Sequence, residues 1–526
     1  MDRWTQKLML VLACLGIAGA AAAKKPNVVL IITDDQSWDT LGFMGGQAHT
    51  PRIDRMADEG MYLSDFNVTS TVCSPSRYSF MTGRFSGNGT GERFMAEHPP
   101  GDQTQVENIG ELEPDRWNLA KVLRKNGYKT GFVGKSHLIN HEWVCETTDN
   151  DNAWKEAGFK LYEQDADPTD PVVNAKMRYN HAKWCEAMKP FGFDFVDGYY
   201  AANLRELFNT TLNVHNLDWS VSKAFNFLEE FKDEPFFLYF STTLHHGPAP
   251  WANQFSMDAD PRMTGEGFVE EGFDVMPSRE DVLKRNREAG FKDNRAFALW
   301  LDDGVGAILD KIKALGLEKD TLVMFVSDHG SYRHGKATLH DYGMRVPMIL
   351  QWKGTIKPNS TYDGILANID IAPTLLDLCG VEPPADYEID GVSFKRQLLG
   401  DSSPVRDVLF GELGHSRCVK TKAWKYIAAR YPLDLQKRVD AGEKFEGFQG
   451  ERLDLPYLTR NGHLGHYASA VNPHYFEADQ LYNLKSDPEE NDNVFEGNPE
   501  VALRMKKELS RELKKFENRP FGEFTK

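Results

Sequence analysis

The most chemically suggestive stretch of this sequence is 73–77 (CSPSR), which is followed by 82–84 (TGR). Proline is tolerated in the first turn of a helix and serine can cap one, so the pattern predicts a helix that begins near Cys73. A nucleophile there would meet unpaired backbone N–H groups, the positive end of the helix dipole and the cation of Arg77. These groups suit a tetrahedral oxyanion.

Two other interpretations of this cysteine compete with the first. Thiol phosphatases need a longer loop between cysteine and arginine than the three residues present here, so the spacing excludes that chemistry. A structural cysteine beside a turn proline is the ordinary explanation of an isolated C-x-P, and it is weakened only by the flanking TGR and by the other motifs described below.

Four short apolar runs, rich in β-branched and aromatic residues, have the pattern of buried parallel strands. In a parallel sheet the carboxyl ends of the strands share one edge, where open α/β sheets place their sites. We therefore expect the polar residues after these runs to converge on one pocket. The runs and these residues are 27–32 with Asp34 and Asp35, 128–133 with Lys135 and His137, 235–242 with His246, and 322–326 with Asp328 and His329.

The residue types at these strand ends indicate what they could do. Asp34 and Asp35 repel one another, and a hard cation such as calcium would relieve that repulsion, whereas a solvated turn is the plainer alternative. Lys135 and His137 lie two apart on an extended end and point the same way, as an oxyanion-binding cation and a base would. An ordinary surface lysine beside a hydrogen-bonding histidine fits the same spacing.

The pair His245-His246 could in principle bind zinc, but no thiol or third histidine lies at suitable spacing. One histidine of this pair is therefore a candidate proton donor. Of the six cysteines, Cys145 and Cys185 could pair, and Cys379 is expected to be a free buried thiol. The chain is not a disulfide scaffold.

Length and charge restrict the class of protein. A chain of 526 residues exceeds a single core, so two domains are expected. The net charge of −17 argues against general affinity for nucleic acid or anionic membranes, and an anionic substrate would need a local basic pocket.

The first 23 residues have the pattern of an export signal: Arg3 and Lys7, an apolar run over 8–20, and three alanines at 21–23. No later stretch is long and apolar enough to span a bilayer. We therefore expect a secreted or periplasmic chain that does not span the membrane.

Taken together, these motifs resemble the type I, formylglycine-dependent sulfatases, and in particular secreted carbohydrate sulfatases. In that family the cysteine of C-x-P-x-R is oxidised to formylglycine before folding. The family has an H-x-P block after the corresponding strand, and this block matches His246 rather than His245. One departure is at 340–341 (HD), where the family usually has a glutamate, so any role of that glutamate is in doubt. The other matching blocks are 50–54 (TPRID), 134–137 (GKSH), 328–329 (DH) and 335–336 (GK).

The resemblance implies an alkaline-phosphatase-like α/β fold: a large, mostly parallel central sheet flanked by helices, and a smaller C-terminal domain with a short antiparallel sheet and a helix. The expected divisions are a signal peptide at 1–23, a catalytic domain at 24–401 and a C-terminal subdomain at 402–526. Residues 141–200 are expected to be an irregular, aromatic-rich insertion or rim.

The resemblance also implies a mechanism. Cys73, as hydrated formylglycine, would attack sulfur and become sulfated. His246 would protonate the leaving alcohol, and His137 would drive the collapse that releases sulfate. The cations implied for the sulfate oxygens are Arg77, Lys135 and Lys336. The implied ligands of one calcium ion are Asp34, Asp35, Asp328, His329 and the oxygen of residue 73.

The implied partners are a sulfated carbohydrate, from an extracellular poly- or oligosaccharide, and a formylglycine-generating maturation enzyme. A formylglycine-dependent phosphonate monoester or phosphodiester hydrolase is the alternative enzyme. A carbohydrate-binding relative in which Cys73 stays a thiol is the alternative outside enzymes.

Overall fold

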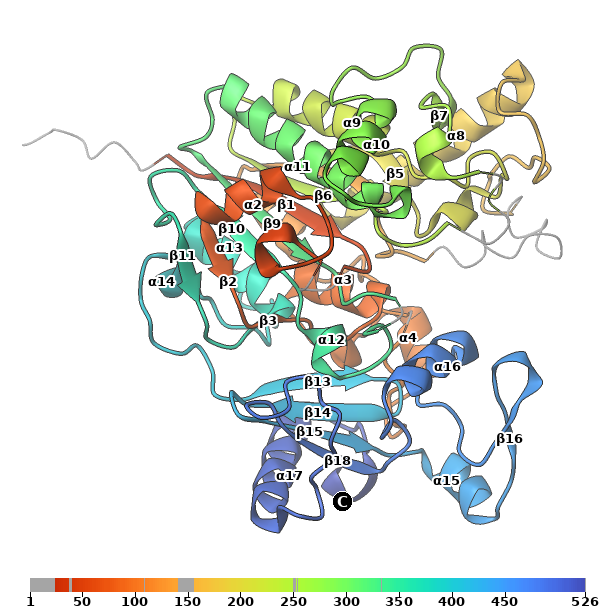
Figure 1. Cartoon of the computed structure of the whole chain (residues 1–526), viewed down its shortest axis with the longest axis vertical. Coiled ribbons are helices and arrows are strands. Elements are labelled where there is room, and N and C mark those ends of the chain that lie inside the picture. Colours follow the sequence, from red (N-terminus) through yellow and green to blue (C-terminus); the bar gives the residue numbers. More distant parts are fainter. Residues whose placement is uncertain are drawn as a thin grey trace, which may run out of the picture.

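A computed structural model describes residues 24–36, 40–107, 109–140, 156–248, 252, 254–332 and 334–525 (Figure 1). The expected signal peptide and Cys145 lie outside these residues. Among the described residues, no helix is long and apolar enough to cross a membrane.

An eight-stranded sheet of order β11-β2-β10-β9-β1-β6-β4-β5 forms the centre of the larger part. Strands β9, β1, β6, β4 and β5 run parallel, whereas β10 is antiparallel to β9. The expected mostly parallel sheet is therefore confirmed. Its strands are β1 Asn27–Thr33, β2 Met61–Leu63, β4 Lys129–Lys135, β5 Phe195–Tyr200, β6 Phe236–Ser241, β9 Thr321–Ser327, β10 Met348–Gln351 and β11 Ser360–Tyr362.

Helices cover both faces of this sheet, and each face has its own apolar core. Because successive side chains of a strand alternate between faces, Val28 and Leu30 pack into one core and Val29 and Ile31 into the other. The helices of the first core are α3 Cys73–Thr82, α5 Leu119–Lys125, α8 Pro171–Met188 and α13 Ile371–Leu378. Those of the second are α2 Pro51–Asp58, α9 Leu217–Glu230, α10 Arg279–Glu288 and α11 Ala296–Ala314.

A smaller antiparallel sheet, β13-β14-β15-β18, lies below the larger part in Figure 1 and packs against α17. Strands β14 and β15 pair antiparallel and are joined as a hairpin. Asn498 occupies the N-cap position of α17, and its side chain donates to the Val494 carbonyl rather than accepting from the first turn of the helix. The strands are β13 Leu409–Leu413, β14 Ser416–Lys420, β15 Trp424–Ala429 and β18 Asp479–Asn483, and the helix is α17 Pro499–Leu513. A division near residue 401 remains our proposal.

A buried ion-pair network joins the two parts. Asp341, at the start of α12 (Asp341–Met344), accepts from Lys420 at 2.9 Å and from Lys425 at 2.5 Å, and Lys425 also contacts Glu490 at 2.9 Å. Asp341 therefore links the larger part to the smaller sheet. Its neighbour His340 lies 3.3 Å from the Tyr482 hydroxyl.

The expectation of an irregular rim at 141–200 is wrong for its second half. Helix α8 and edge strand β5 are regular elements, and Trp184, Tyr199 and Tyr200 are 8%, 2% and 2% exposed. These aromatic side chains belong to the core and are not available to stack on a sugar. Cys185, Cys379 and Cys418 are free and buried, as expected for Cys379.

The structure describes further α-helices and β-strands of two to ten residues. They are β3 Phe66–Asn67, α4 Glu92–Glu97, β7 Met263–Thr264, β8 Gly267–Phe268, β12 Leu366–Ala367, α14 Lys395–Leu398, α15 Leu433–Asp440, β16 Phe445–Glu446, β17 Arg452–Leu453 and α16 Gly462–Val471.

Candidate active site

The four strands predicted to carry the chemistry are direct neighbours, in the order β9-β1-β6-β4, and they end level with one another. Ile32 pairs with Ser241 and Thr33 pairs with Ser327, so the residues that follow these positions start from one sheet edge. The predicted convergence of the strand ends is therefore present in the structure.

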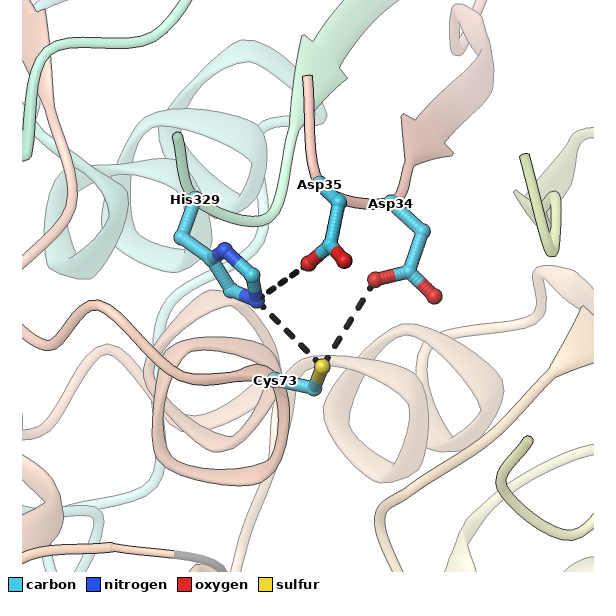
Figure 2. A group of neighbouring side chains, drawn as sticks. All are labelled: Asp34, Asp35, Cys73 and His329. Atoms are coloured by element: carbon cyan, nitrogen blue, oxygen red, sulfur yellow. Dashed lines mark hydrogen bonds and ion pairs between the residues drawn. The ribbon is translucent and has the colours of Figure 1, made fainter. Parts of the chain in front are cut away.

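Cys73 is the first residue of α3, and all ten residues of that helix are buried. Its N-cap, Val72, makes no side-chain cap, so no capping side chain occupies the first N–H groups at the helix end that carries Cys73. The Cys73 Sγ lies 3.3 Å from His329 Nε2 and 3.6 Å from Asp34 Oδ1 (Figure 2). The thiol is 2% exposed.

Asp34, Asp35, Cys73 and His329 form a cluster whose potential ligand atoms all lie within 4.8 Å of one another (Figure 2). His329 Nδ1–H donates to the Gly330 carbonyl at 2.9 Å, which directs Nε2 towards the cluster, as in many metal-binding histidines. Asp35 adopts a left-handed backbone conformation, with φ of 55°.

The remaining predicted ligand, Asp328, lies beside this group but is engaged elsewhere. Its Oδ2 accepts from Arg77 Nε at 3.0 Å, and its Oδ1 accepts from the Asp35 backbone N–H at 3.2 Å. The Oδ1 atom is also 3.6 Å from His329 Nε2, so it remains within reach of a shared cation.

Arg77 lies beneath the cluster and is fully buried. Its guanidinium contacts Asp328, Ser241 and, at 3.7 Å, Asp34. Burial lowers the pKa of Arg77, but the carboxylates of Asp328 and Asp34 raise it by more, so the net pKa lies above its ordinary value and the group stays charged. Arg77 does not line the large hollow beside the cluster, and it holds the Asp328 and Asp34 carboxylates on the side away from that hollow.

Two lysines complete the charge around the thiol. Lys135 Nζ pairs with Asp34, lies 3.7 Å from Cys73 Sγ and donates to Asn203 Oδ1 at 2.8 Å. Lys336 Nζ is 2.9 Å from Asp35 Oδ1 and 3.5 Å from Cys73 Sγ. Both cations therefore reach the place where an oxyanion would form.

The buried charges shift one another's pKa values. Burial raises the pKa of Asp34, but Lys135 and Arg77 lower it more, so the net pKa is well below the ordinary value. Burial lowers the pKa of His329, but Asp328 and Cys73 raise it to about 9. The cluster thus favours a positive charge at its centre, which a proton on His329 supplies and a metal ion could replace.

The predicted histidines line one hollow of about 1160 Å³ together with Cys73, Asp35 and Lys336. His246 Nδ1–H donates to the Gly247 carbonyl at 2.9 Å, which leaves Nε2 for a ligand. Burial, Lys336 and Lys135 lower the pKa of His246 to about 4. His137 is 7% exposed and has a left-handed φ of 54°.

His245 lines the same hollow, and its backbone N–H donates to the Asp34 carbonyl. Burial lowers the pKa of its side chain to about 4. The buried His215 forms a 2.8 Å hydrogen bond between its Nδ1 and the hydroxyl of Thr243, which lies two residues before His245.

Several residues of the site were not expected from the sequence. Asn203, which binds Lys135, follows the end of β5, so the strand-end rule would have found it had that strand been recognised. The C-terminal part adds His463 on α16, whose ring nitrogens lie 2.7 and 3.0 Å from the Tyr332 hydroxyl. No sequence pattern signals that contribution.

Comparison with known proteins places this geometry in a family. Residues 26–381 match the family model described as Sulfatase. The N-acetylgalactosamine-6-sulfatase of Mus musculus is 28% identical over 427 residues, covering 77% of this chain and 72% of that protein. Arylsulfatase G of Homo sapiens is 29% identical over 433 residues, covering 78% and 77%.

Solved structures share the fold at lower identity. A structure from work on glycosaminoglycan metabolism by Bacteroides thetaiotaomicron has a TM-score of 0.58 and 20% identity, and covers 94% of this chain and 100% of that one. A protein solved with its substrate D-glucosamine-2-N,6-O-disulfate has a TM-score of 0.57 and 19% identity, with 95% and 99% covered. The predicted alkaline-phosphatase-like fold agrees with these neighbours. The chain therefore belongs to the sulfatase family and is a sulfuric ester hydrolase.

Proposed function

We propose that this protein removes sulfate from a sulfated carbohydrate, using a formylglycine made from Cys73 and one bound calcium ion. The observation that carries the proposal is the position of Cys73: it begins a buried helix, contacts the Asp34–Asp35–His329 cluster and two lysines, and faces a hollow of about 1160 Å³. That volume exceeds what a sulfate alone needs and suits a sugar-sized ligand.

The donor set fits calcium once residue 73 carries oxygen. Calcium prefers oxygen ligands, which Asp34 and Asp35 supply, whereas a thiolate beside an imidazole suits a softer metal. Conversion of Cys73 to hydrated formylglycine replaces the sulfur by oxygen and leaves His329 as the single nitrogen ligand. Asp328 Oδ1 would complete the set of carboxylates.

When bound, the ion and the aldehyde hydrate supply a Lewis acid and an oxygen nucleophile to the sulfate ester. The chain's own residues do the rest. Lys135 and Lys336 neutralise the negative charge that develops on the sulfate oxygens. Arg77, which the sequence suggested as a further contact of the sulfate, instead orients Asp328 from beneath.

We assign proton transfer to the two histidines of the hollow. His246 Nε2 protonates the leaving alcohol, which a sugar alkoxide requires and a phenolate does not. His137, on the same hollow, accepts the proton in the step that releases sulfate. In the ligand-free pocket His246 is neutral at neutral pH, and a bound sulfate screens Lys336 and Lys135 and so raises its pKa.

The names of the relatives support a sugar as the substrate. N-acetylgalactosamine-6-sulfatases are prominent among them, although a steryl-sulfatase of Rattus norvegicus is 27% identical over 463 residues, covering 76% of this chain and 74% of that protein. We further propose that residues 1–23 direct export, that a maturation enzyme converts Cys73, and that the substrate is an extracellular glycan. The comparisons do not favour the phosphonate or phosphodiester alternative.

The test is sulfate release from a panel of sulfated sugars, a sulfated steroid and an aryl phosphonate, by protein co-produced with a formylglycine-generating enzyme. Mass spectrometry of the peptide that contains Cys73 reports the conversion, and Cys73→Ala is the blank. Release from a sugar, dependent on conversion, is the expected result. Turnover of the phosphonate alone, or full activity with an unmodified thiol, would refute the proposal.

A further inference from the structure

The hollow contains more positive charge than a single sulfate group requires. Among its described lining residues, Asp35 is the sole carboxylate, whereas Lys336, Arg205 and Arg295 are cations. This contrasts with a whole-chain net charge of −17. Lys336 is already engaged at Asp35 and the nucleophile, so the two arginines are the positive charges that the sulfate mechanism does not use.

Arg295 stands at the wall where α11 begins. Arg295 is exposed and forms no salt bridge among the described residues, and the nearby Asp293 pairs with Arg287. The first turn of α11 contains no acidic residue, and Phe297 and Ala298 from that turn also line the hollow. Arg295 is close enough to His245 to help lower its pKa, and both residues line the hollow that His246 also lines.

Arg205 stands on the wall above Lys135. It lies two residues after Asn203, the hydrogen-bond acceptor of Lys135 Nζ, in the 3₁₀ turn Leu204–Leu207. The Arg205 Nε is 3.1 Å from Oε1 of Glu206, whose side chain is 2% exposed while that of Arg205 is 59% exposed. A buried carboxylate therefore holds the Arg205 guanidinium at its Nε, in a side chain that is largely exposed and lines the hollow.

We propose that Arg205 and Arg295 form a second anion subsite, which binds a carboxylate or a second sulfate on the same substrate molecule. The substrate would then be a polyanionic sugar, such as a disulfated hexosamine or a sulfated hexosamine joined to a uronic acid. Guanidinium groups suit both anions because their N–H groups match the planar carboxylate and the sulfate oxygens. The inference rests on the proposed function and adds the substrate's second charge.

The experiment compares Arg205→Gln and Arg295→Gln with the matured wild-type enzyme. The substrates form matched pairs: glucosamine 2-N,6-O-disulfate against N-acetylglucosamine 6-sulfate, and a sulfated uronate–hexosamine disaccharide against its uronate methyl ester. An aryl sulfate with one charge reports the catalytic centre. Arg124→Gln, an exposed arginine paired with Asp194 and outside the hollow, controls for the loss of one charge.

We expect either arginine variant to lower kcat/KM about tenfold for the doubly charged member of at least one pair, mainly through KM, with less than a twofold change for the singly charged member. The first pair tests a second sulfate and the second pair a carboxylate. Equal losses for both members of every pair, or no loss relative to Arg124→Gln, would overturn the inference.

The two proposals fail in different ways. If wild-type enzyme hydrolyses the aryl sulfate but neither arginine variant discriminates within a pair, the subsite is wrong and the sulfatase chemistry stands. If wild-type enzyme releases no sulfate from any substrate, binding of the disulfated sugar to Cys73→Ala by calorimetry decides the subsite alone. Tighter binding than that of the monosulfated partner, lost on adding Arg295→Gln and Arg205→Gln, supports it, and equal binding refutes it.

Discussion

The assignment of His246 as the proton donor makes a quantitative prediction about pH. A general acid acts only in its protonated form, and burial, Lys336 and Lys135 lower the pKa of His246 to about 4 in the free enzyme. Above that pKa the protonated fraction falls with each unit of pH. Activity is therefore lost on the alkaline side, at every pH above that pKa.

The magnitude follows from the protonated fraction. With a pKa of about 4, roughly one tenth of the enzyme carries the proton at pH 5 and roughly one thousandth at pH 7. We expect kcat/KM for a sugar sulfate to fall about tenfold per pH unit, or about a hundredfold between these two values. The slope does not depend on the exact pKa while that value lies below the measured range.

The assay measures kcat/KM for a hexosamine sulfate and for an aryl sulfate across this range and takes their ratio. A phenolate leaves without protonation, so pH effects shared by both substrates cancel in the ratio. His246→Ala should lower the sugar reaction roughly a hundredfold at about pH 5 and remove the slope of the ratio. His474→Ala, a histidine outside the hollow, is the control and should leave both unchanged.

A ratio that is flat with pH in the wild-type enzyme would refute the role of His246, and so would a His246→Ala variant that retained the slope. If the slope disappeared in His137→Ala instead, the proton donor would be that histidine.

Three further predictions concern stability and metal binding. Burial raises the pKa of Glu412 to about 7, so ionisation of this side chain lowers the free energy of unfolding as pH rises from about 4.5 to about 7. Glu412→Gln should remove about 3 kcal/mol of that decline, measured by urea unfolding at several pH values. An unchanged dependence of the unfolding free energy on pH would contradict this. Lys425→Met leaves Asp341 and Glu490 buried without their partner and should lower the free energy of unfolding by about 3–5 kcal/mol. Lys422→Met, at an exposed lysine, is the control and should lower it by less than about 0.5 kcal/mol. Equal losses in the two variants would disprove the role of the buried network. A calcium chelator should lower both Tm and kcat, and calcium rather than zinc should restore them; insensitivity of both to the chelator would exclude the ion.

The convergence of the site was predictable because it depends on local patterns. Each of these parallel strands is a short run with its chemical group at or soon after its carboxyl end: Asp34 directly follows β1, and Lys135 is the last residue of β4. Once the strands are known to be parallel, sheet geometry alone brings these groups to one edge. Cys73 was placed at a helix start for an equally local reason.

Contacts between distant segments could not be predicted in this way. Arg77 was expected to face the sulfate, but its partner Asp328 is 251 positions away and only the folded chain shows that it turns beneath the cluster. The contribution of His463 depends on how the smaller part packs against the larger one, and the Asp341 network is one of the contacts between them.

Helix α8 was missed although its pattern was present. Its buried residues Met177, His181, Trp184 and Met188 follow the helical period, and Asp170 caps the helix with its side chain. A histidine on the buried stripe and polar residues around it weakened the apolar signal. Because α8 was missed, the edge strand β5 and the loop that carries Asn203 and Arg205 were missed with it.

The burial of helix α3 restricts when Cys73 can be modified. Because Cys73 is 2% exposed and every residue of its helix is buried, an enzyme can bind and modify this segment only while it is unfolded. If Cys73 is converted as proposed, the conversion must precede the folding of α3, and a molecule that folds first keeps its thiol. The specific activity of a preparation would then report the fraction of molecules converted before folding.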